Sequence, residues 1–197
     1  MEKRINEQES IQIIMNMITS VKQDMYDNSF YYLLWGWLVF AASLSHFALL
    51  YTGFPHPEIA WMLMPVGGVM TAVYSIRQKR NKHVKTYVDE FMKYVLIAFL
   101  VCLFISLFLQ EKLQLNTYPV VLMVYGFWLF ISGGAIKFKP LVIGGVINWL
   151  CAVVAFFVAF DMQLLLLAMA VLLGYIIPGY MLRVKHQQQT HSANMAI

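Results

Sequence analysis

LVIGGVINWLCAVVAFFVAFDMQLLLLAMAVLLGYIIPGYML fills residues 141–182 and contains one charged residue, Asp161. The stretch is about twice the length of roughly 20 residues that an α-helix needs to cross the hydrocarbon core of a bilayer. The chain must therefore reverse once within it, and we expect the turn at residues 160–163, with the Asp161 carboxylate at the water interface. Apolar and polar residues do not alternate here, which indicates spanning helices rather than strands of a barrel.

Four more apolar runs precede this stretch, at residues 30–50, 59–76, 94–109 and 120–136. With 141–160 and 162–182 they predict six transmembrane helices. The composition agrees, because 60% of the residues are hydrophobic and 12% are charged, whereas a soluble domain is about 25% charged. We expect an all-α integral membrane protein with three parts: a cytoplasmic amphipathic helix in residues 1–28, a six-span domain in residues 29–182, and a cytoplasmic tail in residues 183–197.

The basic residues predict the orientation of the spans. All but one of the 14 Lys and Arg residues fall on the same side as the N-terminus, and the exception is Lys112. Cytoplasmic loops of membrane proteins carry an excess of Lys and Arg. We therefore expect a multi-pass protein of the cell inner (cytoplasmic) membrane with both termini in the cytoplasm. Because the basic residues flank apolar runs, nucleic acid is not an expected partner.

Two stretches outside the spans carry patterns of their own. Residues 6–27 predict an amphipathic helix with a coiled-coil-type seam over residues 11–25, formed by Ile11, Ile14, Ile18, Val21 and Met25. This seam either packs on the bundle and the lipid headgroups or joins a second copy or a partner subunit. The basic segment 77–93 is expected to contact anionic lipids, at about 1 kcal/mol per basic residue near the surface.

The first and second halves of the chain resemble each other weakly. At an offset of 90 residues, Gly36 aligns with Gly126 and Phe40 with Phe130. Three spans in each half would place the halves in opposite orientations, as in transporters with a 3+3 inverted repeat. Chance similarity between apolar segments rich in glycine and aromatic residues explains the same pattern.

Glycine, proline and one amide give the candidates for a ligand pathway. In inverted-repeat transporters the substrate binds near the midplane, where helices interrupted by Gly or Pro expose backbone groups. The corresponding candidates here lie in the second and fifth spans, with a break expected in the second span; small residues also allow close helix packing without any ligand. The candidates are Pro65, Gly67, Gly68, Gly144, Gly145 and Asn148.

Motifs for catalysis are missing from the sequence, and metal ligands are sparse. There is no HExxH, P-loop, GxGxxG or GxSxG pattern, so we expect a non-enzyme without a cofactor. Four side chains at the predicted outer surface are weak candidate zinc ligands. Loop and interface positions explain them better, and we expect no tight metal site. They are His46, His56, Glu58 and Asp161.

Two function classes follow from these patterns. The first is a small transporter, or a substrate-binding membrane subunit, for an unidentified small molecule. The alternative is a non-transporting interaction or regulatory protein that acts through its N-terminal helix. We favour the first because of the Gly/Pro pattern and the mid-span Asn148, even though the spans carry no carboxylate at midplane depth that would couple transport to protons.

Overall fold

The computed structural model describes residues 29–79 and 87–195, and every regular element among them is helical. The predicted seam at 11–25 and part of the basic segment 77–93 lie outside the described residues. The elements, in chain order, are α2 (Ser29–Tyr51), η1 (Pro57–Met62), α3 (Leu63–Lys79), α4 (Tyr87–Phe108), α5 (Gln110–Leu113), η2 (Gln114–Asn116), α6 (Thr117–Ala135), α7 (Lys139–Ala155), α8 (Phe160–Val171), η3 (Leu172–Ile176) and α9 (Ile177–Met195).

The long helices run roughly parallel to one axis, and α8 with η3 lies at the centre of their contacts. On one side α8 packs against α2, and the Ser43 hydroxyl donates a hydrogen bond to the Leu164 carbonyl oxygen at 2.7 Å. On the other side it packs against α7 and α6, which form the most extensive helix pair. Fully buried leucines such as Leu122, Leu129 and Leu167 fill the core between these helices.

Helices α3 and α4 lie at the outside of the bundle and present broad apolar faces. α3 packs on α2, and α4 packs on α6. Their exposed side chains include Met62, 72% exposed just before α3, and Phe104 and Phe108 in α4, which are 72% and 78% exposed. A monomer in water rarely exposes a continuous apolar surface of this size, whereas lipid tails cover it readily. The chain is therefore a membrane-embedded helical protein.

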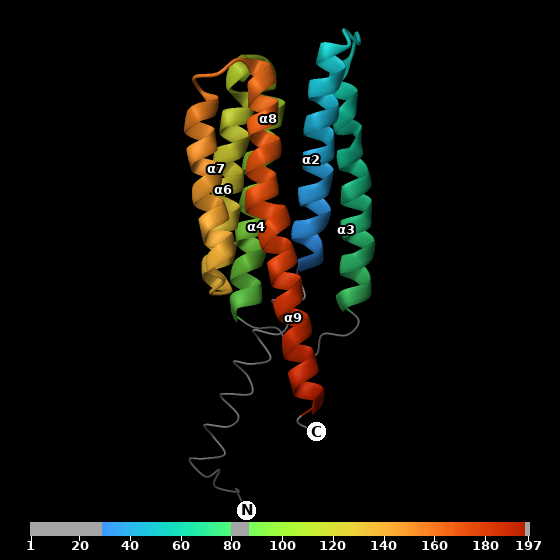
Figure 1. The fold of residues 1–197 in the computed structure, drawn as a ribbon, viewed down its shortest axis with the longest axis vertical. Helices are drawn as coiled ribbons and strands as arrows, with labels where there is room; N and C mark the ends of the chain where they lie inside the picture. The colour runs from blue at the N-terminus through green and yellow to red at the C-terminus, as the bar shows by residue number, and fades with distance from the viewer. Residues whose placement is uncertain (1–28, 80–86, 196–197) are drawn as a thin grey trace, which may run out of the picture.

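Among the described residues, five helical stretches are long and apolar enough to cross a membrane: Ser29–Tyr51, Pro57–Arg77, Glu90–Phe108, Gln110–Ala135 and Phe160–Lys185. The remaining predicted span, residues 141–160, corresponds to α7, an apolar helix of 17 residues. The third and fourth spans extend beyond the predicted runs because flanking turns join their helices. Beyond the last span, α9 continues to Met195 and projects past the other helices (Figure 1).

The turn between α7 and α8 lies earlier than predicted. Residues 156–159 form it, so the predicted reversal at 160–163 is wrong. The prediction took the single charge as the marker of the turn. The structure instead places Asp161 in the first turn of α8, where free backbone N–H groups and the positive end of the helix dipole favour a carboxylate. Phe157 occupies the turn and is 86% exposed.

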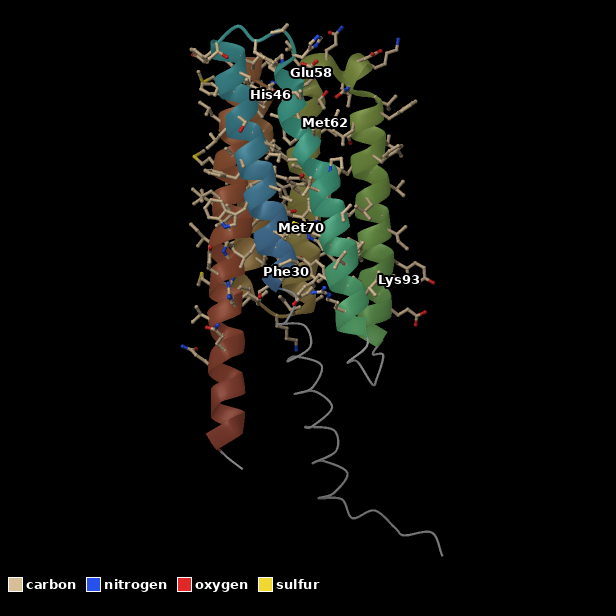
Figure 2. The ribbon with its side chains drawn as sticks, turned by 90° about the vertical axis from the view of Figure 1, so that its right-hand side faces the viewer. Phe30, His46, Glu58, Met62, Met70 and Lys93 are labelled. Carbon is tan, nitrogen blue, oxygen red and sulfur yellow. The ribbon has the colours of Figure 1, made fainter. Side chains whose placement is uncertain are left out.

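Charged residues separate to the two ends of the bundle. The described basic residues at the end where α2 begins and α9 leaves are Arg77, Lys79, Lys93, Lys137, Lys139, Arg183 and Lys185. Lys112 lies at the opposite end, together with Glu58, Glu111 and Asp161. Figure 2 shows this separation, with Lys93 near one end and His46 and Glu58 near the other.

The aligned glycines of the two halves have different surroundings. A Cβ atom at Gly36 would lie 3.0 Å from Ile176 Cγ1, whereas one at Gly126 would collide with the indole of Trp149 on α7. Gly36 thus faces η3, and Gly126 faces α7. The inverted repeat stays a prediction.

Candidate functional site

Asn148 is the most deeply buried amide side chain among the described residues, with an exposed fraction of 0%. It lies near the middle of α7, whose regular spacing turns this side chain toward α8. Its Nδ2 group donates hydrogen bonds to the carbonyl oxygens of Gly144, at 2.8 Å, and Ala170, at 3.3 Å. Because both neighbours are acceptors, the NH₂ group must face them and Oδ1 must point elsewhere. Oδ1 has no hydrogen-bond partner among the described residues.

The helix opposite Asn148 is irregular. Residues 172–176 form a π-helix between α8 and α9, and such single turns are often found at functional sites. Gly174, inside this turn, lies directly against Asn148, and a Cβ atom at Gly144 would be 2.8 Å from the Gly174 Cα atom. The backbones of α7 and η3 therefore touch through glycines. Asn148 faces the turn of η3 in which the α-helical hydrogen-bond pattern is interrupted.

Three buried tyrosines meet next to the same π-helix. The Tyr175 ring lies 5.5 Å from the ring of Tyr125 on α6 and 6.3 Å from the ring of Tyr32 on α2, measured between centroids. All three side chains are at most 9% exposed. In the interior of the bundle, η3 thus lies between the Asn148 amide on one side and three tyrosine phenol groups on another.

The other pathway candidates divide between two places. Gly144 and Gly145 are buried beside Asn148 and make close backbone contacts with Gly174 and with α6, respectively. Gly67 packs instead against Leu38 and Trp35 of α2, and Gly68 is exposed with nothing within 4 Å of its Cβ position. The structure therefore does not bring the glycines of α3 next to Asn148.

The predicted break in the second span is absent. α3 runs without interruption through Gly67 and Gly68, and Pro65 occupies its first turn. Proline fits there because the first N–H groups of a helix have no partner within the helix. Pro140 likewise opens α7. The irregular backbone predicted for α3 occurs in the last span, at residues 172–176.

A second polar cluster, around His46, closes the opposite end of the bundle. His46 lies on α2 and is 5% exposed. The Trp61 Nε1–H group of η1 donates to His46 Nδ1 at 2.9 Å, and the Tyr118 hydroxyl lies 3.2 Å from the same nitrogen. Since the indole nitrogen can only donate, Nδ1 carries no proton and the imidazole is neutral. The ring also contacts Phe160 at the start of α8.

The four candidate metal ligands do not converge. His46 Nδ1 is already occupied by Trp61, and His56 pairs with Glu58 at 3.1 Å on the exposed surface. Within the described ranges 29–79 and 87–195, no three histidine, cysteine or carboxylate side chains come close enough together to hold a metal ion. Cys102 and Cys151 are free thiols.

The sequence singled out Asn148 but not the groups around it. Tyr32, Tyr125 and Tyr175 lie in three different spans, and aromatic residues are common in every apolar run, so no spacing marks these three. Gly174 likewise gives no local signal of a π-helix. No family model, curated protein or solved structure matches the chain.

Proposed function

We propose that this chain is a six-span protein of the cytoplasmic membrane that works as a small transporter, or as a substrate-binding membrane subunit, for a small molecule. In this proposal both termini are cytoplasmic and the protein is not an enzyme. The asymmetry of Lys and Arg between the two ends supports the orientation. The observation that carries the functional proposal is the unpartnered Oδ1 atom of Asn148.

An orphan acceptor inside a membrane protein is energetically costly. Burying an amide oxygen without a hydrogen bond costs about 1–3 kcal/mol in proteins, and lipid supplies no donor. Polar groups at this depth are therefore often functional. A ligand that donates a hydrogen bond to Oδ1 would recover this cost, as would water that enters with it.

Access to Asn148 needs a change in the bundle, because the side chain is sealed from solvent in this conformation. We assign this change to the π-helix at 172–176, because it already departs from the hydrogen-bond pattern of the α-helix. We place the ligand pathway along Gly144, Gly145 and Asn148 on α7 and assign Gly67 to helix packing with α2.

Cysteine accessibility tests this proposal without knowledge of the ligand. The native thiols are first removed by Cys102→Ala and Cys151→Ala, and Asn148→Cys is then introduced. A matched control is Leu167→Cys on α8, which is 1% exposed and lies one helical turn from Ala170. Proteoliposomes are treated with a charged, water-soluble methanethiosulfonate, which modifies only thiols that meet water.

We expect modification of Asn148→Cys and none of Leu167→Cys. If both positions stay unmodified, no water-accessible path reaches Asn148 and transport is excluded in favour of the interaction protein that the 11–25 seam predicts. If both react at the same rate, general opening of the bundle explains the result and the proposed pathway is wrong.

A further inference from the structure

The turn between α6 and α7 and the start of the α9 tail form a compact basic surface. We propose that three lysines around Phe138, namely Lys137, Lys139 and Lys185, bind the phosphate of an anionic phospholipid headgroup. This surface is separate from the basic segment 77–93 and from the Asn148 site. The proposal needs only the membrane location of the chain and does not depend on the transport function.

The first observation is the backbone of the turn. The Phe138 N–H group donates to the Gly133 carbonyl oxygen at 2.8 Å, and the Lys137 N–H group donates to that of Gly134 at 3.1 Å. This pattern is a Schellman C-cap, whose left-handed position is usually glycine. Lys137 holds it instead, with φ at +53°. The turn therefore places a lysine at the cap position that helices usually give to glycine, at the end of α6.

The second observation joins the tail to this turn. The Lys185 ammonium lies over the Phe138 ring, 5.6 Å from its centroid, which is within the range of a cation–π contact. Phe138 itself is 5% exposed and anchored in the core. The Phe138 ring therefore holds the Lys185 ammonium beside the turn. The two chain neighbours of Phe138 are Lys137 and Lys139, and all three lysine side chains are exposed.

The third observation is the distribution of acidic residues. Among the described residues, Glu58, Glu111 and Asp161 lie at the opposite end of the bundle, while Asp89 and Glu90 lie at the start of α4, at the same end as the three lysines but on another helix. The first turn of α7, which follows Phe138, carries no acidic residue. The turn joins two membrane helices, so its lysines lie at headgroup depth, and basic surfaces at this depth bind anionic lipid headgroups.

Lipid titration of the purified full-length protein tests the assignment. Phosphatidylglycerol is added to the protein in detergent micelles, and binding is read from thermal unfolding followed by tryptophan fluorescence. Phosphatidylcholine and inorganic phosphate serve as the other two arms. The variants are Lys137→Gly and Lys185→Gln, with Arg183→Gln as the matched control, because Arg183 is equally basic and exposed but lies two residues from Lys185 and so on another face of α9.

We expect phosphatidylglycerol to raise the melting temperature more than phosphatidylcholine does, and inorganic phosphate to have no such effect. Each lysine removed should weaken phosphatidylglycerol binding about fivefold, while Arg183→Gln binds like the parent. Lys137→Gly should also raise the melting temperature without lipid, because glycine relieves the left-handed backbone. A higher melting temperature without lipid would show that weaker lipid binding by Lys137→Gly does not come from a loss of folding.

Two results would overturn the proposal. Equal weakening in Arg183→Gln would show that net charge alone attracts the lipid and that these three lysines form no site. Equal protection by inorganic phosphate would show that the surface takes a free anion rather than a membrane headgroup.

Discussion

The Trp61 indole nitrogen donates a hydrogen bond to His46 Nδ1 across 2.9 Å, and this contact fastens η1 to α2. The Trp61 ring stacks near Tyr118, and the His46 ring packs edge-on against Phe160. Four elements, α2, η1, α6 and α8, therefore meet around one neutral imidazole. The cluster therefore helps to hold η1 against α2 at this end of the bundle.

Trp61→Phe should lower the stability of the protein by about 1–3 kcal/mol, because it leaves a buried imidazole nitrogen without its strongest donor. The measurement is thermal unfolding in detergent micelles, followed by circular dichroism because the tryptophan content changes. Trp37→Phe is the matched control, since Trp37 is 46% exposed. Equal losses in the two variants would mean that the Tyr118 hydroxyl alone satisfies His46.

Gly144→Ala should destabilise the bundle by about 1–3 kcal/mol. The added methyl group would lie 2.8 Å from the Gly174 Cα atom and 2.9 Å from its carbonyl oxygen, so two backbones must move apart. Gly134→Ala is the control, because nothing lies within 4 Å of that Cβ position and alanine favours a helix over glycine by up to about 1 kcal/mol.

Thermal unfolding of the two glycine variants in the same detergent checks this prediction. Gly134→Ala should equal or exceed the parent in melting temperature, while Gly144→Ala should unfold at a lower temperature. A Gly144→Ala variant as stable as the parent would contradict the close contact between α7 and η3.

Labelling of intact cells should reveal the orientation of the bundle. On a background without native cysteines, we expect Pro57→Cys and Asn116→Cys to react with an impermeant maleimide added outside. Gln187→Cys, which lies in α9 beyond the end of the last apolar stretch at Lys185, should react only after the cells are opened. Asn116 and Gln187 are exposed, and Pro57 is half-buried at the start of η1. Labelling of position 187 in intact cells would reverse the topology that the lysine and arginine residues predict.

Local composition was enough to predict the membrane helices. A run such as 162–182 must bury its backbone hydrogen bonds within itself once it enters lipid, so its length and lack of charge dictate a helix. The boundary at Asp161 was predicted less well, because a turn at the interface tolerates an exposed phenylalanine. Phe157 therefore occupies the turn, while the carboxylate lies in the next helix.

The sequence by itself determined that this chain is helical, lies in a membrane and gathers its Lys and Arg residues at one end of the spans, since these properties follow from the hydropathy and charge of short stretches. Only the tertiary structure decided which polar groups meet. Asn148 finds the Ala170 carbonyl oxygen on the next helix, and His46 finds Trp61 on η1, because helix rotation and close glycine contacts set those distances. The π-helix at 172–176 is another feature that only the tertiary structure decided. It depends on packing between helices, and packing depends on side chains far apart in the chain.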